Sequence, residues 1–322
     1  TMALTLLQLV ATTQAELGLF PVATTVVGNT DNGVQQMLAL ANALGRSLAS
    51  ERSWTAQQRT AIINPVAPIV MTGDTTAGSV IINNLSSTAS LAPAYWLATG
   101  AGIPSAARVQ SIGSATSLSL DSQATTTATG VSITFSKDRY DLPSDFLNII
   151  NDTEWDRTNH WRLAGPMSPQ EDEWVRSGIV TTGPRRRIRI TSVYGGASAT
   201  QNRVMQIWPA PATTDGASTL SYEYMSTSWV RFISAGVAFI KGTFSADTDV
   251  CIFPDALMVA GLKRRFWSIK GFDTTDLENE YQLERQKAIS QDAGAQVLGM
   301  GRRRSPMFVS PGNIQDGNFP GP

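Results

Sequence analysis

The sequence predicts an α+β protein with a helical bundle built from both chain ends, a central β domain plus an inserted small β-sandwich, and an extended C-terminal tail. Three observations lead to this fold class. Apolar residues recur at helical spacing before residue 50 and again after Pro254. Between these regions, short alternating apolar and polar runs are separated by turn-forming residues, which is the pattern of strands. From Gly299 the chain is rich in Gly and Pro and shows no periodicity.

Residues 1–70 are expected to form the N-terminal part of the helical domain. Thr5 begins a capping-box pattern, and Gly18 can end the helix that follows. A second helix is expected after Asp31, with an apolar face made by Val34, Met37, Leu38, Ala41, Leu44 and Leu48. The N-terminal segment lacks a basic region and contains Glu16, so it is interpreted as a helix rather than a signal peptide.

The tract 71–135 is expected to be an inserted β-sandwich module. It carries few charges, and the composition changes near Thr72 and again near Gly130. The ends of an inserted domain are expected to lie close together. Its strand candidates are Ser79–Ile82, Val109–Ile112, Ser117–Leu120 and Val131–Phe135.

Residues 136–250 are expected to form a loop-rich β domain. Its later strand candidates are Arg187–Val193, Arg203–Trp208 and Leu220–Met225. The turn dipeptide Asp215-Gly216 lies between the last two, so these two are expected to pair.

Residues 251–298 are expected to return to the helical domain. Pro254 suits a first helical turn, and Thr275–Glu278 has the pattern of a further capping box. The remaining residues, 299–322, are expected to form the extended tail.

The composition excludes several functional classes. Of 322 residues, 42% are hydrophobic, which is enough for a substantial core, and the formal net charge is -1. A nearly neutral chain gives no general electrostatic argument for nucleic-acid binding. The single cysteine, Cys251, has apolar neighbours, so it is expected to be a buried thiol and cannot form an intramolecular disulfide. The sequence contains no apolar run of the roughly 18 residues that would predict a membrane span.

The stretch Asp141–Trp174 is the strongest candidate for a functional site. It contains three tryptophans, the only histidine and many carboxylates. His160 alone would have to serve any catalytic triad, and the sequence has neither a Cys/His cluster nor a phosphate-binding glycine loop. No catalytic residue, metal or cofactor is therefore expected. The stretch is interpreted as structural, with a buried Trp155 as its anchor and an interface motif of Trp155, Asp156, Arg157, Trp161 and Trp174.

Several motifs of this chain occur in an order that resembles a known family. The first helix ends in Glu-Leu-Gly, and YDLPSDF (Tyr140–Phe146), TEWDRT (Thr153–Thr158) and GPMSPQE (Gly165–Glu171) follow in that order. Over residues 1–70 and 135–300 this arrangement resembles the head-to-tail adaptor proteins of tailed bacteriophages, also called connectors or tail accessory factors. The tract Thr75–Phe135 is similar instead to the immunoglobulin-like or bacterial surface-type repeats that phage structural proteins often carry.

The resemblance implies a structural virion protein at the head-tail junction, made in the host bacterial cytoplasm. Its implied partners are the portal protein, a downstream tail or nozzle protein, and further copies of the same chain in a ring, usually of twelve. The ring would continue the channel through which double-stranded DNA passes, with no reaction, cofactor or membrane involved. The tail would bind the portal, through Arg302, Arg303, Arg304, Met307, Phe308, Val309 and Phe319.

Two other functions stay open on the sequence alone. The tract Thr75–Phe135 would serve a phage adhesin that binds a glycan or receptor. Paired carboxylates such as Glu154 and Glu171 would serve a cell-wall hydrolase, although neighbours in sequence do not establish the cleft that such an enzyme needs.

Overall fold

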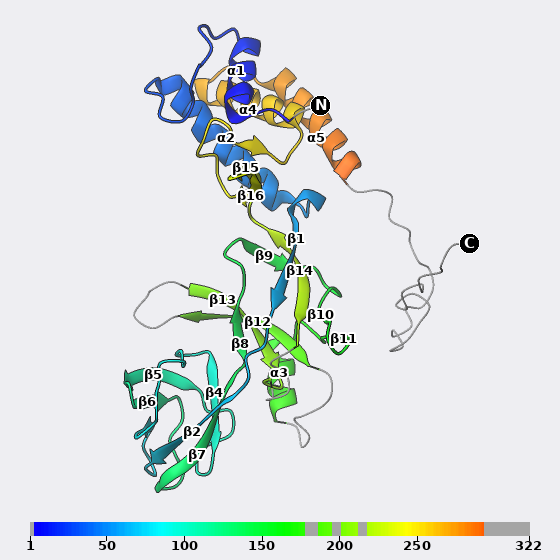
Figure 1. Cartoon of the computed structure of the whole chain (residues 1–322). Coiled ribbons are helices and arrows are strands. Elements are labelled where there is room, and N and C mark those ends of the chain that lie inside the picture. The colour runs from blue at the N-terminus through cyan, green and yellow to red at the C-terminus, as the bar shows by residue number, and fades with distance from the viewer. Residues whose placement is uncertain (1–2, 178–185, 195–200, 212–217, 293–322) are drawn as a thin grey trace, which may run out of the picture. The chain divides into compact units, whose positions relative to one another are not determined.

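The computed structural model describes residues 3–177, 186–194, 201–211 and 218–292. The chain divides into two compact units (Figure 1). Of the described residues, the first unit contains the chain up to Arg59, the segment Ser144–Ile149 and the chain from Tyr224 to Asp292. The second unit contains Thr60–Pro143 and Ile150–Glu223. Helices and antiparallel strands are both abundant, which confirms an α+β protein; the expected bundle and sandwich arrangements stay predictions.

Helices from both ends of the chain share the core of the first unit. They are α1 (Leu6–Glu16), α2 (Asn32–Glu51), α4 (Asp255–Lys270) and α5 (Thr275–Asp292). One cluster of buried side chains contains residues from all four, including Leu9, Leu44, Leu262 and Tyr281. Apolar spacing on separate helices thus produces a common hydrophobic core.

The helix starts follow the sequence signals closely. The Thr5 hydroxyl accepts a hydrogen bond from the Gln8 amide at 3.3 Å, and the Gln8 side chain accepts one from the Thr5 amide at 3.0 Å. This is the predicted capping box. Asp31 caps α2 by accepting from the Val34 amide at 3.0 Å. The fourth helix of this core begins where predicted, but the Thr275 hydroxyl donates to Asp273 at 2.7 Å, outside the predicted capping box.

Trp229 links the strands of the first unit to its helices. The side chain is fully buried, and its ring meets Phe244 edge-on with the centroids 4.9 Å apart. On α2, Gly45 faces this ring so closely that an added Cβ would lie 2.2 Å from it. Only a residue without a side chain allows the helix backbone to approach the indole in this way.

Two groups of strands belong to the first unit. The strands β15 (Val230–Ser234), β16 (Val237–Lys241) and β17 (Val250–Cys251) form a sheet in the order β16-β15-β17. The strand β9 (Phe146–Ile149) pairs antiparallel with β14 (Leu220–Ser226), with Tyr224 opposite Ile149.

The tract predicted as an insertion forms two small sheets in the second unit. The strands of one are β2 (Ile69–Thr75), β7 (Ala128–Lys137) and β4 (Trp96–Gly100), in the order β2-β7-β4. Those of the other are β3 (Ile81–Ile82), β6 (Ser117–Leu120) and β5 (Val109–Ser114), in the order β3-β6-β5. Gly73 pairs with Val131, so the chain enters and leaves the tract on adjacent strands.

The remaining strands form two further sheets. The strands β12 (Arg187–Tyr194), β13 (Gln201–Trp208) and β8 (Arg139–Asp141) form one of them, in the order β12-β13-β8. In the other, the strand order is β1-β14-β10-β11, with β1 at Gln58–Ile63, β10 at Trp155–Asp156 and β11 at Trp161–Arg162.

The predicted pairing of Arg203–Trp208 with Leu220–Met225 is wrong. The first segment, β13, pairs with β12 on one side and with β8 on the other, so neither of its edges is available. The second segment, β14, pairs instead with β9 and β10. A turn dipeptide indicates where the chain reverses, but it does not select the partner of the strand that follows.

Two short helices complete the described elements. They are the 3₁₀ helix η1 (Thr55–Gln57) and α3 (Pro169–Arg176). In the part of the chain that the structure describes, no helix has both the length and the apolar character needed to cross a membrane.

Candidate functional site

The interface motif predicted from the sequence lies on a small antiparallel ladder of the second unit. Trp155 of β10 pairs with Arg162 of β11 and with Ser221 of β14. Asp156 pairs with Trp161 and with Leu220. Trp155, Asp156 and Trp161 are therefore part of a sheet, with Trp155 and Trp161 on neighbouring strands, whereas Trp174 lies on α3.

Two carboxylates at this ladder, Asp156 of the motif and the preceding Glu154, are deeply buried. Glu154 is completely buried and Asp156 is 3% exposed. One Asp156 oxygen accepts from the Thr158 and Asn159 amides, both at 3.0 Å, and the other accepts from the Asn159 side chain at 2.9 Å. A short acidic side chain that binds amides two and three residues further on fixes the turn between the two strands.

Glu154 has a different electrostatic environment. Burial raises the pKa of its carboxyl group above the ordinary glutamate value, while the charge of Arg162 acts in the opposite direction. Arg162 itself forms an ion pair with Asp152 at the same end of the ladder.

The tryptophans of the motif are less buried than predicted. Trp155 and Trp161 are partly exposed, and Trp174 on α3 is 74% exposed. The expectation of a buried Trp155 is wrong for the single chain, because successive side chains of a strand point to opposite faces and the inner face holds Glu154 and Asp156. Aromatic surface is thus left accessible around buried carboxylates.

The other candidate chemical groups of this stretch are exposed or already bonded. His160 is exposed and has a φ of 57°, the left-handed conformation of a turn residue. Arg157 is also exposed. Glu171 completes a capping box at the start of α3, because its side chain accepts from the Ser168 amide at 2.8 Å. Glu171, one of the two candidate hydrolase carboxylates, therefore has a structural role as part of a helix cap.

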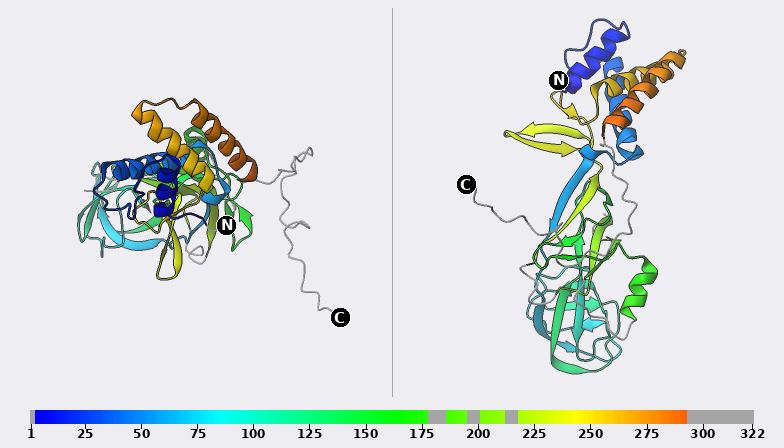
Figure 2. Two further views of the ribbon diagram at one scale, coloured as in Figure 1. Left: turned by 90° about the horizontal axis from the view of Figure 1, so that it is seen from above. Right: turned by 90° about the vertical axis from the view of Figure 1, so that its right-hand side faces the viewer.

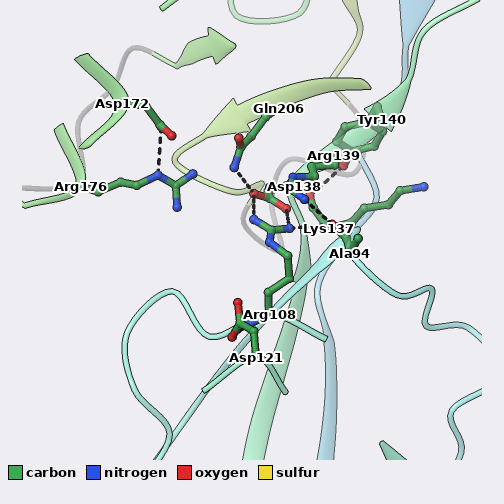
Figure 3. Close-up of polar contacts among 10 residues, drawn as sticks. All are labelled: Ala94, Arg108, Asp121, Lys137, Asp138, Arg139, Tyr140, Asp172, Arg176 and Gln206. Carbon is green, nitrogen blue, oxygen red and sulfur yellow. Dashed lines mark hydrogen bonds and ion pairs between the residues drawn. The ribbon is translucent and has the colours of Figure 1, made fainter. Parts of the chain in front are cut away.

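A second polar cluster, which the sequence did not indicate, is centred on Asp138 (Figure 3). This carboxylate is completely buried between β7 and β8. The guanidinium of Arg108 donates to both of its oxygens, at 2.6 and 2.7 Å, and the Gln206 side chain donates to one of them at 2.9 Å. Bidentate charge-assisted hydrogen bonds of this kind hold an aspartate in one orientation.

Arg139 and Arg108 converge on the same backbone group. Each donates to the Ala94 carbonyl at 3.0 Å. Burial, followed by repulsion from Arg108, lowers the pKa of Arg139 to about 10. No spacing rule relates Arg108 to a carboxylate thirty positions later, and the run Lys137-Asp138-Arg139 resembles an exposed charged turn. The tertiary structure alone brings these residues together.

A third carboxylate joins α3 to the β12-β13-β8 sheet. Asp172 is 3% exposed and accepts from Arg176 at 2.9 Å (Figure 3). It also accepts from Arg189 at 2.7 Å. Arg176 also lies over the ring of Trp208, 4.5 Å from its centroid. The buried carboxylates of the second unit therefore hold loops and strands together.

The described residues include no cluster of potential metal ligands. Among them, no group of three or more His, Cys, Asp and Glu residues is arranged to hold a metal ion. The predicted portal-binding residues all lie outside the described part of the chain: Arg302, Arg303, Arg304, Met307, Phe308, Val309 and Phe319.

A comparison with models of protein families identifies the family of this chain. The model of the family described as SU10 adaptor protein matches residues 105–312, which is more than half of the chain. The chain belongs to the SU10 adaptor protein family. This confirms the resemblance to phage head-tail adaptors that the sequence motifs indicated. No curated protein matches the adaptor.

Family membership places the adaptor among the structural components of a phage virion. Portal and tail proteins are the partners that such a family implies. The match begins at residue 105, inside the tract predicted as an inserted module. The immunoglobulin-like character of that tract stays a prediction.

Proposed function

We propose that this adaptor forms a ring below the portal, connects the capsid to the tail and continues the DNA channel. Membership in the SU10 adaptor protein family carries the proposal. The roles of the buried carboxylates agree with it, because Asp138, Asp156 and Asp172 all bind groups of the same chain. Such side chains stabilise a scaffold and are not presented to a substrate.

The charge of the chain supports a channel through which DNA moves. A ring of copies with a formal net charge of -1 each would carry no net positive charge. A strongly basic lumen would hold DNA by releasing counterions from its phosphates. A nearly neutral ring would allow DNA to pass in both packaging and ejection.

The tail is proposed as the portal-binding segment. Residues 299–322 combine three consecutive arginines with apolar side chains, of which Phe308 is proposed as the principal anchor. Apolar residues on a Gly- and Pro-rich segment suit an extended peptide that orders in a groove of its partner. The arginines would pair with carboxylates of the portal.

The mass of the assembly tests this function. Native mass spectrometry of the purified adaptor, alone and mixed with the portal protein of the same phage, is expected to show a portal complex containing many adaptor copies, twelve for the usual ring. Electron microscopy of the complex is expected to show a ring coaxial with the portal. An adaptor that stays monomeric and unbound with the portal present contradicts the proposal.

A further inference from the structure

The hairpin formed by β15 and β16 has an unusual surface. Its tip is Ala235-Gly236, whose φ angles of 50° and 78° are those of a two-residue hairpin turn. The two strands pair over their whole length, from Val230 opposite Lys241 to Ser234 opposite Val237. In the right-hand view of Figure 2, this yellow hairpin extends sideways from the base of the helices.

The base of the hairpin is fixed in the helical core. Trp229 and Val230 are both completely buried. The Trp229 amide donates to the Lys241 carbonyl and its carbonyl accepts from the Ile252 amide, both at 3.1 Å. Val230 also pairs with Cys251 of β17. The hairpin therefore starts from a rigid support, and its surface exposure begins only beyond that point.

Apolar side chains cover the part of the hairpin that projects. Ile233 is 74% exposed, Val237 is 55% exposed and Phe239 is 47% exposed. Ile233 lies on one face of the ladder, while Val237 and Phe239 lie on the other. An isolated two-stranded hairpin is only marginally stable in water, and clustered exposed apolar residues commonly mark an interaction site. This hairpin has the properties of an arm that a partner covers.

A groove elsewhere in the first unit has complementary properties. It encloses about 550 Å³ between the α1–α2 connection and the helices, and its apolar lining includes Leu19, Phe20, Val22, Met37 and Phe266. Asp31 is the one charged residue among the lining residues that the structure describes. The hairpin segment 230–241 carries only basic charges, Arg231 and Lys241, and Lys241 forms an ion pair with Asp249 of its own chain at 2.7 Å. The hairpin and the groove thus both present apolar surface, and the basic hairpin residue and the acidic groove residue are opposite in charge.

We propose that the β15–β16 hairpin of one adaptor copy occupies the α1–α2 groove of the neighbouring copy. The inference rests on the proposed ring, because it assigns the contact that repeats around it. A projection that fits a different surface of the next copy makes a head-to-tail contact, and such contacts generate rings when the rotation closes. The tip of the hairpin enters the groove, so that Ile233 on one face and Val237 on the other both contact its walls. Arg231, on the same face as Ile233, lies at the acidic rim near Asp31.

Cysteine cross-linking tests the contact with little background. Burial raises the pKa of the native Cys251 thiol to about 12, so this cysteine stays protonated and inaccessible to the oxidant at pH 8. Two single variants, Ile233→Cys and Leu19→Cys, are mixed in equal amounts, assembled on the portal and oxidised. The mixture is expected to give a disulfide-linked dimer containing one copy of each variant. A chain carrying both changes is expected to give a ladder of covalent multimers.

A matched variant serves as the control. Val70 on β2 is 64% exposed and belongs to the second unit, so Val70→Cys mixed with Leu19→Cys is expected to give no such dimer. In a parallel experiment, Ile233→Ser combined with Val237→Ser is expected to raise the concentration needed for half-maximal ring assembly about tenfold or more. Val70→Ser is expected to leave that concentration unchanged. Circular dichroism confirms that each variant is folded.

The outcomes separate this inference from the proposed function. If the wild-type adaptor forms no ring with the portal, the proposed function and the inference are both overturned. If the ring forms but the Ile233→Cys and Leu19→Cys variants give no mixed dimer, only the hairpin contact is overturned. The same holds if Ile233→Cys cross-links to the portal, or if the double serine variant assembles as well as the wild type.

Discussion

The completely buried Asp138 forms an ion pair with Arg108, whose side chain is 11% exposed, and both oxygens of the aspartate are bound to the guanidinium at 2.6 and 2.7 Å. Arg108 comes from the tract 71–135, and Asp138 follows directly after that tract. The core of this unit shows the same continuity, since it includes Val193 and Val204 together with side chains such as Ile133 of the tract. The tract is thus attached to the neighbouring sheet by charge as well as by apolar packing.

Removing one member of this pair should destabilise the second unit strongly. Arg108→Ala leaves the Asp138 carboxylate buried without its counter-ion, a change that costs about 3–5 kcal/mol in comparable sites. Chemical denaturation monitored by tryptophan fluorescence measures this loss. Arg157→Ala removes an exposed arginine and is expected to change the free energy of unfolding by less than about 0.5 kcal/mol. Equal effects of the two substitutions would contradict the assignment.

Replacing Gly73–Gly130 with a short Gly/Ser linker should preserve ring assembly. The core of the first unit contains no residue of the replaced segment among its described members, and Gly73 pairs with Val131, so a short linker can join the ends. The second unit should nevertheless lose stability, because the deletion removes Arg108 and leaves Asp138 without it.

The substitution Asp138→Asn provides the control for that deletion. Within the shortened chain it removes the uncompensated charge, so the melting temperature is expected to rise relative to the shortened chain with Asp138. In the full-length chain the same substitution is expected to lower the melting temperature. A shortened chain that no longer assembles on the portal would show that the tract is required for the ring.

The raised pKa of Glu154 predicts a pH-dependent contribution to stability. Burial makes the folded state retain this proton more strongly than the unfolded state does. The contribution is therefore fully present below the unfolded-state pKa of about 4.3 and is lost as the pH rises through the folded-state pKa. Glu154→Gln should be more stable than the wild type at pH 7, with the difference shrinking as the pH falls toward 4. Urea denaturation at several pH values tests this, and a destabilised variant at pH 7 would overturn it.

Truncating Trp155 should affect assembly more than folding. The side chain is partly exposed in the single chain, so Trp155→Ala is expected to cost less than the roughly 3–5 kcal/mol of a fully buried aromatic residue. Its exposed face is expected to contribute to an interface, so ring formation on the portal should weaken. Trp174→Ala, at a position 74% exposed, is the matched control for folding stability. A Trp155→Ala protein with unchanged melting temperature and unchanged assembly would remove the residue from the interface motif.

Truncation after Gly301 should separate attachment from folding. Both described cores consist of residues before Asp292. The free energy of unfolding is therefore expected to stay within about 1 kcal/mol of the full chain's value. Portal binding, measured by surface plasmon resonance, is expected to weaken severely. Added salt should weaken binding of the full chain only in part, because salt screens the arginine pairs but not the apolar anchors. Equal binding by both chains would show that the tail is not the portal contact.

The sequence predicted local structure well and long-range pairing poorly. The capping box at Thr5 depends on residues three positions apart and forms as expected. The pairing of β13 depends on the tertiary contacts that place β12 and β8 on its two edges, and a turn signal carries no information about those contacts. The prediction of a buried Trp155 was wrong for another reason. Hydrophobicity predicts burial only on average, and in this strand the two carboxylates Glu154 and Asp156 lie on the inner face.

The missing side chain at Gly45 has a mechanical consequence. Because the α2 backbone rests directly on the Trp229 indole, no flexible side chain separates the long helix from the strand that begins at Val230. A load applied to the β15–β16 hairpin passes through Trp229 into α2 with little side-chain compliance between them. The hairpin is therefore coupled rigidly to the helical core. A displacement of the hairpin tip would tilt α2.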